Sequence, residues 1–483
     1  MPGLRRLPRS TPEEQGVDPW ALLRLVDALV AWPELHSVMV VRHGSVVAEG
    51  WAAPFAADRL HELFSLSKSF TSTAVGFAVA EGLLTVDDLV LDHFPEQALA
   101  APDENLRRMR VRHLLTMTTG HAEDPTPRVQ GTDDWVTAFL EEPVEHEPGT
   151  FFVYNTAGTH LLSALVQKLT GQRVLDYLGP RLLEPLGIEG AAWQRSPSGV
   201  DVGGSGMSGT TEDIAALGQL YLQDGVWDGR RVLPEGWAAE ATRAQVSNAG
   251  NPDVDWAQGY GYQFWRGRHG SYRGDGAFGQ FCVVLPEQDL VVAITSGVAE
   301  MHGELALVWD HLLPGLSDGP LPDDHHGRHA LTQRLEGLRI DPPHGAPTTP
   351  TGDRLDGRTI TFEPNTLGIR NVVLEVGDSH DRLTVDHEEE TVIVSVGHAL
   401  PALTRTTLRR ADPEDVLVSG AWTGPDTYVL TFRFVESPFV VTATATVTGD
   451  AVVVGSGFNV AFGPTELPTL TGTVLSHPQA AVS

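Results

Sequence analysis

Apolar residues follow two different periods in the first two-thirds of the chain. The two-residue period of β-strands marks runs at 37–42, 45–48, 259–265, 278–285 and 290–295. Helical spacing fills the stretch from 65 to about 225, and a further helix is predicted near 300–313. The order of strands, helices, strands and helix predicts an α+β domain, in which both ends of the domain complete one sheet around an all-α insert.

The last part of the chain has the strand period alone. Residues 427–434 and 441–447 alternate apolar and polar side chains, and Gly449-Asp450 marks a turn. Short strands at regular intervals predict a small all-β sandwich or barrel domain over residues 357–483. Residues 314–356 are rich in Pro, Gly, Asp and His, and are predicted to be a linker of low order with one short helix near 331–338. The first domain then covers residues 1–313.

One serine and one lysine stand at the start of the first predicted helix of the insert. The sequence reads Ser65-Leu66-Ser67-Lys68, and apolar residues at helical spacing follow it, from Phe70 to Ala78. Ser65 is therefore predicted at a helix N-terminus, with Lys68 one turn later on the same face. Glu81-Gly82 supplies a plausible glycine stop.

Lysine is rare in this chain, which gives Lys68 additional weight. Lys68 and Lys168 are the two lysines, and arginine supplies the remaining basic residues. A serine hydroxyl is a poor nucleophile until a nearby base takes its proton, and arginine cannot act as that base because it stays protonated. The residues favour an activated nucleophile. A serine N-cap followed by a surface lysine is the alternative that this motif leaves open.

Composition excludes several classes of protein. The formal net charge of −30 argues against nucleic acid and anionic membranes as partners. The basic N-terminus has no apolar segment after it, so no signal peptide is predicted, and no run reaches the roughly 18 apolar residues of a membrane span. Cys282 is the single cysteine and is predicted to be a buried, inert thiol. These features together predict a cytoplasmic protein.

Four segments together resemble a known family. The Ser65–Lys68 motif is followed in order by segments 111–121, 147–156 and 274–280. In this combination the chain resembles the serine β-lactamase/penicillin-binding-protein superfamily, in its class C, esterase-like and nylon-oligomer-hydrolase-like branch, over about residues 10–313. The resemblance implies a β-lactamase-like antiparallel sheet with helices and a serine nucleophile.

The resemblance also implies roles for residues of the second motif. Tyr154 corresponds to the family's proton carrier, and a lysine ammonium beside it would lower the pKa of the phenol, which would let it act as a base. The family's Y-x-N pattern is altered here, because Asn155 takes the middle position and Thr156 the last. Either side chain could bind substrate or Lys68.

The third motif departs further from the family. Where the family often has a cation, this chain has Gly274, or Arg273 if the register shifts by one, and Asp275 follows. A carboxylate-binding role is therefore in doubt. The glycines would still let this strand approach the acyl oxygen closely, so Gly276 and Ala277 are predicted in the oxyanion site, with the amides of Ser65 and Ala277 as donors.

Two other patterns are given structural interpretations. The glycine-rich stretch 204–209 has no strand before it, so it is predicted to be a tight loop into a helix that Thr210 opens. His325, His326 and His329 with two aspartates could hold a metal, but a solvated linker is the favoured interpretation. His61 and His121 are predicted to be structural histidines.

The predicted function is that of a serine hydrolase acting on a small ester or amide through an acyl-enzyme. No cofactor or metal is implied, and the predicted partner is a small-molecule substrate. β-Lactamase or D-amino-acid peptidase activity is the alternative. It is placed second because such enzymes act outside the cytoplasm and bind carboxylates, whereas no signal peptide is predicted here and the third motif lacks a firm cation. A catalytically idle family member used for binding is a second alternative.

Overall fold

The computed structural model of the chain describes residues 7–32, 34–97, 102–388, 390–408 and 413–475. Arg5 and Arg6, which make the N-terminus basic, lie outside these ranges. The chain forms two compact units. The first comprises Met1–Ala52, Ala56–Ser296 and Glu300–Leu338, and the second comprises Ala53–Phe55, Gly297–Ala299 and Arg339–Ser483.

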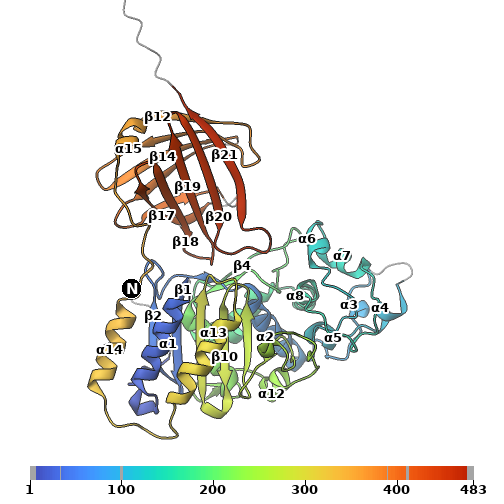
Figure 1. Cartoon of the computed structure of the whole chain (residues 1–483). Helices are drawn as coiled ribbons and strands as arrows, with labels where there is room; N and C mark the ends of the chain where they lie inside the picture. Colours follow the sequence, from blue (N-terminus) through green and yellow to red (C-terminus); the bar gives the residue numbers. More distant parts are fainter. Residues whose placement is uncertain (1–6, 33, 98–101, 389, 409–412, 476–483) are drawn as a thin grey trace, which may run out of the picture. The chain divides into compact units, whose positions relative to one another are not determined.

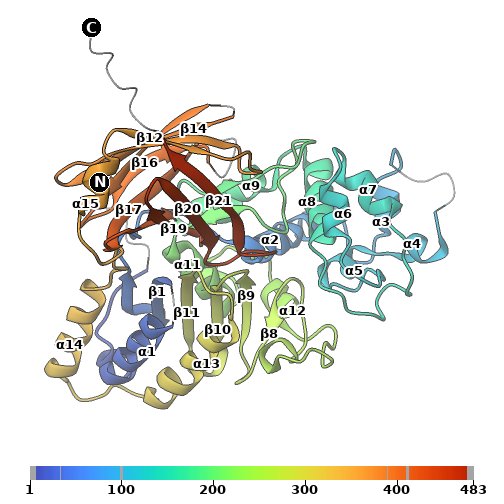
Figure 2. The same ribbon diagram turned by 45° about the horizontal axis from the view of Figure 1, so that its top comes forward.

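A six-stranded antiparallel sheet forms the centre of the first unit. Its strand order is β2-β1-β11-β10-β9-β8, so the hairpin that precedes the helical insert lies beside the strands that follow it (Figure 2). The strands are β1 (Leu35–Arg42), β2 (Ser45–Trp51), β8 (Trp265–Arg266), β9 (Tyr272–Gly276), β10 (Gln280–Leu285) and β11 (Leu290–Ser296). The predicted α+β arrangement is confirmed.

Helices cover both faces of this sheet, which explains why β1, β10 and β11 are buried along their whole length. Helices α1 (Pro19–Ala31) and α13 (His302–Leu307) lie in front of it in the view of Figure 1. On the other face α11 (Thr211–Leu222) approaches so closely that a Cβ on Gly218 would lie 2.8 Å from Cys282 Sγ. Cys282 is buried in β10, as expected.

The helical insert lies between β3 and β8 in the chain. Its helices are α2 (Ser67–Ala80), α3 (Val90–His93), α4 (Glu104–Arg108), α5 (Val111–Leu115), α6 (Thr126–Gln130), α7 (Trp135–Glu141), α8 (Thr156–Thr170), α9 (Val174–Leu178), α10 (Glu184–Leu186) and α12 (Trp237–Thr242). A small sheet in the order β3-β5-β4 joins β3 (His61–Glu62), β4 (Ala192–Trp193) and β5 (Met207–Gly209). A two-stranded ribbon pairs β6 (Val226–Trp227) with β7 (Arg230–Arg231).

One predicted strand is irregular in the structure. Of residues 259–265 only Trp265 is in a strand, β8. The backbone here lies against the Ala241 carbonyl oxygen, which accepts a hydrogen bond from the Tyr262 amide. The approach is so close that a Cβ on Gly261 would lie 2.1 Å from that oxygen. Because this backbone is tied to α12 and the loop after it, it cannot complete a regular ladder.

The predicted linker holds two helices, α14 (His325–Glu336) and α15 (Pro350–Leu355). Leu331 of α14 is buried, and α14 packs against α1 and β2 within the first unit. The prediction of low order is therefore wrong for the part of this segment that forms α14. Although the segment is rich in Pro, Gly, Asp and His, its Leu331 is buried where α14 packs against α1 and β2. The domain boundaries at 313 and 357 stay a prediction.

The second unit is a β-barrel of ten strands. Its order is β15-β14-β13-β12-β21-β20-β19-β18-β17-β16, and a further pairing of β15 with β17 closes the barrel. The strands are β12 (Arg358–Phe362), β13 (Ile369–Glu375), β14 (His380–His387), β15 (Thr391–Gly397), β16 (Ala402–Thr406), β17 (Glu414–Gly424), β18 (Thr427–Phe434), β19 (Val440–Thr448), β20 (Ala451–Phe458) and β21 (Glu466–Val474). Gly449-Asp450 forms the predicted turn between β19 and β20.

In the part of the chain that the structure describes, no helix combines the length and apolar character needed to cross a membrane.

Candidate active site

Ser65 lies in a sharp turn between a short strand and a buried helix. The Leu63 amide binds the Met207 carbonyl beyond the end of β3, and the chain then forms a 3₁₀ turn over Phe64–Leu66 before α2 begins. Phe64 has a φ of 47°, a conformation that costs a non-glycine residue about 1–3 kcal/mol and recurs at active sites. Residues 61–70 are buried except Ser65, which keeps partial exposure. The turn therefore presents the Ser65 hydroxyl at a surface.

Helix α2 differs from the prediction in one respect: it is buried all round from Ser67 to Ala78, whereas an amphipathic helix was expected. Two of its hydroxyl residues bond within or next to the helix, since Ser67 donates to the Phe64 carbonyl and Thr73 to the Ser69 carbonyl. Such bonds allow serine and threonine on a fully buried helix. The helix that carries Lys68 is consequently a rigid, dry support.

Lys68 points directly at the nucleophile. Its Nζ lies 2.9 Å from Ser65 Oγ, 3.0 Å from Thr156 Oγ1 and 2.6 Å from the Gly204 carbonyl oxygen. The side chain is only 1% exposed. Burial lowers the pKa of Lys68 to about 7, and the charges of Asp124 and Asp275 oppose this shift only in part.

These three contacts suit a neutral amine. A neutral amine has two N–H donors and one lone pair, whereas an ammonium has three donors and no lone pair. Thr156 and the Gly204 carbonyl can take the two donors, which leaves the lone pair facing the Ser65 hydroxyl. With a pKa near 7, a large share of Lys68 is in this form at neutral pH. Lys68 is therefore placed to take the Ser65 proton.

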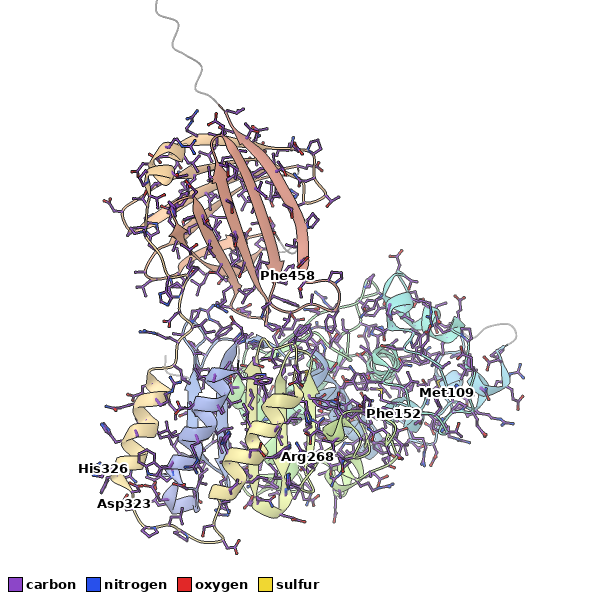
Figure 3. The ribbon with its side chains drawn as sticks, in the orientation of Figure 1. Met109, Phe152, Arg268, Asp323, His326 and Phe458 are labelled. Carbon is purple, nitrogen blue, oxygen red and sulfur yellow. The ribbon has the colours of Figure 1, made fainter. Side chains whose placement is uncertain are left out.

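Tyr154 lies on the other side of the nucleophile. Its ring stacks on Trp265 at 5.2 Å between centroids, and Lys68 Nζ lies 4.7 Å from the centre of the Tyr154 ring. Its hydroxyl lies beside the Ser65 side chain. Phe152 precedes Tyr154 by two residues and also packs on Trp265. It lies where the helical insert meets the sheet (Figure 3).

The expected lowering of the Tyr154 pKa is wrong. Burial and the charge of Asp275 raise the pKa of Tyr154, and the hydrogen bond with Ser65 opposes this only in part. The reason is that Lys68 is itself desolvated, so it supplies little positive charge to stabilise a phenolate. Tyr154 is therefore a neutral phenol in this site, whereas the lowered pKa of Lys68 suits that residue to accept a proton.

Asn155 and Thr156 have separate tasks. Asn155 is the N-cap of α8: its Oδ1 accepts from the Gly158 amide at 2.8 Å, and its Nδ2 donates to Thr119 Oγ1 at 3.1 Å. The side chain is fully buried and its polar atoms bind protein groups, and the substrate-binding role of Asn155 stays a prediction. Thr156, the next residue, directs its hydroxyl to Lys68.

Glycines bring β9 against the nucleophile turn. A Cβ on Gly276 would lie 2.1 Å from the Leu63 carbonyl oxygen, and one on Gly274 would lie 2.6 Å from Ser69 Oγ. Any larger residue would push the strand away from the turn. Ala277, which follows β9, is partly exposed at the start of the turn into β10. The amides of Ser65 and Ala277 as oxyanion donors stay a prediction.

Gly276→Ala is expected to lower kcat/KM at least tenfold and to destabilise the protein by about 1–3 kcal/mol, because the new methyl group overlaps the Leu63 carbonyl. Ester hydrolysis and thermal unfolding measure the two effects. Gly250→Ala is the matched control, since a Cβ there would meet nothing within 4 Å. Full activity and an unchanged Tm for Gly276→Ala would contradict the close approach.

Strand β9 also carries a buried ion pair that the sequence did not reveal. Arg273 Nε binds Asp275 Oδ2 at 3.0 Å, Arg273 Nη1 donates to the Asp255 carbonyl, and its guanidinium lies 4.5 Å from the centre of the Trp256 ring. Burial raises the pKa of Asp275, while Arg273 opposes this shift. The cation that this strand supplies is therefore already engaged by protein groups.

The two candidate histidines have structural contacts. His61 Nε2 lies 3.0 Å from His36 Nδ1, and burial lowers the pKa of His61 to about 3. His121 Nδ1 lies 2.8 Å from Thr119 Oγ1, in the group that holds the Asn155 cap. Neither contact involves Ser65, which agrees with the structural roles predicted for them.

The glycine-rich stretch leads into a helix as predicted, but its second half, Met207–Gly209, forms strand β5 instead of a loop. Thr210 and Asp213 make a reciprocal capping box at the start of α11. The Gly204 carbonyl, which binds Lys68, lies in the loop before it. Every residue has a main-chain carbonyl oxygen, whatever its side chain. No sequence pattern could therefore have revealed this contact.

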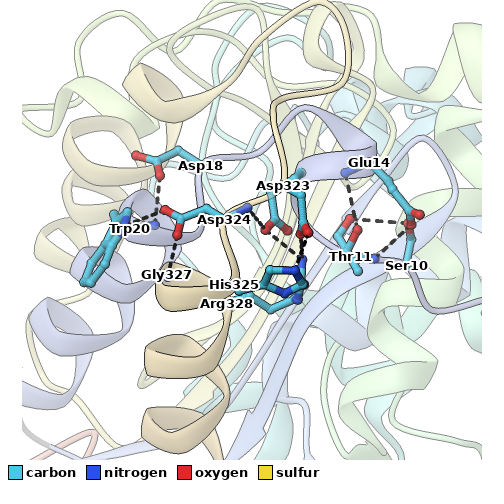
Figure 4. A network of polar contacts seen from close by, with 11 residues as sticks. Ser10, Thr11, Glu14, Asp18, Trp20, Asp323, Asp324, His325, Gly327 and Arg328 are labelled. Carbon is cyan, nitrogen blue, oxygen red and sulfur yellow. Dashed lines mark hydrogen bonds and ion pairs between the residues drawn. The ribbon is translucent and has the colours of Figure 1, made fainter.

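The histidines near residue 325 belong to a helix terminus (Figure 4). Asp324 caps α14 by accepting from the Gly327 amide at 2.9 Å and also binds Trp20 Nε1. Asp323 pairs with both His325 and Arg328. Across the described residues, no group of three or more histidine, cysteine or acidic side chains has the arrangement of a metal site.

Comparison with known proteins identifies the family. The β-lactamase family model matches residues 24–312. The chain belongs to the β-lactamase family. Among its relatives are the 6-aminohexanoate-dimer hydrolase of Paenarthrobacter ureafaciens, 28% identical over 53% of this chain and 70% of that protein, and penicillin-binding protein 4 of Amycolatopsis lactamdurans, 28% identical over 54% and 81%.

A solved structure extends the likeness to both units. The octameric penicillin-binding protein homologue of Pyrococcus abyssi aligns with a TM-score of 0.50 at 15% identity, covering 94% of this chain and 99% of that one. At this identity the likeness concerns the fold alone. It supports a β-lactamase-like fold followed by an all-β unit, as the sequence predicted.

Proposed function

We propose that this member of the β-lactamase family is a serine hydrolase that works through an acyl-enzyme. The observation that carries the proposal is the 2.9 Å contact between Ser65 Oγ and the Nζ of a buried lysine whose pKa is lowered to about 7. Such a lysine is a competent base at neutral pH, and it touches a hydroxyl that a sharp turn presents at the surface.

The proposed reaction has two halves. Ser65 Oγ attacks the substrate carbonyl carbon while its proton passes to Lys68 Nζ, and the amides of Ser65 and Ala277 hold the oxyanion. The leaving group then takes a proton from Lys68 through the hydroxyl of Tyr154, which is neutral and lies beside Ser65. A water molecule then attacks the acyl carbonyl and gives its proton through Tyr154 to Lys68. Lys68 returns a proton to Ser65 Oγ as the acyl group leaves, which restores Ser65.

A small ester or amide is the proposed substrate. The relative from Paenarthrobacter ureafaciens is named for hydrolysis of a 6-aminohexanoate dimer. On β9 the only cation is Arg273, which is buried and paired with Asp275, so this strand gives little support for binding a substrate carboxylate. The chain is equally similar to a penicillin-binding protein, so β-lactamase or D-amino-acid peptidase activity is the alternative function. An idle, ligand-binding protein is the second alternative.

Turnover of an aryl ester against that of a chromogenic cephalosporin separates these functions. The proposal expects the ester to have the higher kcat/KM, and expects Ser65→Ala to remove that activity. A preference for the cephalosporin would favour the β-lactamase alternative. Turnover of neither substrate, nor of short amides, in a folded sample would favour the binding protein.

The pH dependence of kcat/KM follows from the base. Lys68 is active when it is unprotonated, so kcat/KM is expected to rise about tenfold per pH unit below its pKa and to level off above about pH 7. Initial rates with an uncharged ester between pH 5 and 9 measure this. Tyr154→Phe should lower the plateau but keep the inflection, because the Tyr154 pKa lies above this range. An inflection that Tyr154→Phe abolishes would make the tyrosine the base.

A further inference from the structure

The interior of the ten-stranded barrel is not filled by its own side chains. It holds a cavity of about 290 Å³ whose lining comes from nearly every strand of the barrel and is mostly aliphatic and aromatic. That is far more space than the roughly 10–15 Å³ that one water requires, and it approaches the ~300 Å³ of small-molecule pockets. Protein interiors are normally packed without such voids.

Strand β19 shows how the sequence keeps the space open. Alternate residues of this strand, Val441, Ala443, Ala445 and Val447, line the cavity, while threonines occupy the positions between them. The two alanines stand where a barrel of this size would need large side chains to fill its interior. Both alanines are partly exposed although they face inward, because the cavity leaves part of their surface without packing partners.

Helix α15 lies at one end of the barrel (Figure 1), and its Leu355 lines the cavity. Thr351 Oγ1 binds Asp426 at 2.5 Å and Arg354 Nη2 binds the Gly449 carbonyl at 2.9 Å, so α15 is attached to the two strand turns at this end. A Cβ on Gly352 would lie 3.0 Å from the Trp422 indole, which also lines the cavity.

The opposite end has a different chemistry. Phe458 marks that end of β20 (Figure 3). His387, Thr406 and Ser456 line the cavity there, because each lies at or near the end of its strand that is remote from α15. The serine, the threonine and the histidine of the lining therefore all lie toward the Phe458 end, whereas Tyr428, toward the α15 end, already donates its hydroxyl to Asp381.

We infer that the barrel binds a linear aliphatic chain with a polar head group, the chain lying toward α15 and the head toward His387, Thr406 and Ser456. An apolar cavity of this size offers water few hydrogen-bond partners, whereas an aliphatic chain regains the contacts that the empty space forfeits. A polar head would meet side-chain donors and acceptors at the Phe458 end. A fatty acid or an aliphatic alcohol has this shape and chemistry.

Titration of the full chain with the fluorescent fatty acid cis-parinaric acid tests the inference. Saturable binding at one site per chain is expected, with displacement by dodecanoate and by dodecanol. Stronger displacement by the acid would indicate that the head group is a carboxylate, and equal displacement would indicate a general polar head. Binding that does not saturate, or no binding, would overturn the inference.

Matched variants place the ligand inside the barrel. Ala445→Trp fills the cavity and is expected to weaken binding at least tenfold, while Thr446→Trp, one residue away on the exposed face, leaves it unchanged. Ala443→Leu fills the space with a smaller side chain and serves if the tryptophan variant fails to fold. Undiminished affinity in a folded Ala445→Trp or Ala443→Leu protein would show that the probe binds elsewhere.

Discussion

Ser65→Ala is expected to abolish hydrolysis, with kcat reduced by about 10⁴–10⁶-fold. The substitution removes the Oγ that forms the acyl-enzyme and leaves Lys68 and Tyr154 without the group that they serve. Ser65 is partly exposed and contributes little to the core, so the variant should fold with an unchanged Tm. Rates with the preferred ester, measured beside thermal unfolding, test both statements.

Ser72→Ala is the matched control for this loss. Ser72 lies on α2, is fully buried, and its hydroxyl has no hydrogen-bond partner among the described residues. Removing such a hydroxyl is expected to leave activity unchanged and stability equal or slightly higher. Residual turnover by Ser65→Ala above about a thousandth of the parent rate would place the nucleophile elsewhere.

Lys68→Arg is expected to reduce kcat/KM by about 10²–10⁴-fold, the contribution of a general base. A guanidinium keeps the positive charge but does not release its proton near neutral pH, so it cannot accept the proton of Ser65. The loss should persist at high pH, where the parent enzyme has reached its plateau. Circular dichroism and thermal unfolding establish that the larger side chain is accommodated at a position that is only 1% exposed.

The chain provides its own control, because Lys168 is the other lysine. Lys168 pairs with Glu96 at 2.5 Å on a largely exposed surface. Surface ion pairs contribute little, and arginine preserves this one, so Lys168→Arg should retain full activity. A Lys68→Arg protein that keeps more than about a tenth of the parent kcat/KM would contradict Lys68 as the base.

The contact between Ser65 and Lys68, the proposed nucleophile and base, was predictable from the sequence because its geometry is local. A helix brings positions three residues apart onto one face, so Ser65 and Lys68 had to meet once that helix formed. Tyr154 and Thr156 were found through family resemblance, and neither could be placed from periodicity. The choice between Asn155 and Thr156 required the structure, because it depends on which residue is the N-cap of α8.

Other parts of the site depend on contacts between distant segments. The Gly204 carbonyl and the pairing of Arg273 with Asp275 arise from packing that no local pattern encodes. Strand β9 was predicted through the family resemblance and not from periodicity, because its two glycines disfavour a strand, yet those glycines are what allow it to lie against the Ser65 turn. The lowered pKa of Lys68 likewise depends on burial by the whole insert.

The barrel illustrates the same division. Alternation predicted β18 and β19 and the turn between β19 and β20. The closing contact of Gly397 with Ser419 joins strands that are separated by β16, and such a pairing leaves no trace in the two-residue period. The sequence could therefore not distinguish a sandwich from a barrel. The cavity inside the barrel could be recognised only from the structure.

Labelling with a fluorophosphonate probe, followed by peptide mass analysis, tests the central claim most directly. An activated serine forms a covalent adduct with this reagent, so the account predicts modification confined to Ser65, absent from Ser65→Ala, and faster as the pH rises through about 7. Modification of a different serine, or equal labelling of Ser65→Ala, would contradict the assignment of Ser65 and Lys68 as the nucleophile and its base.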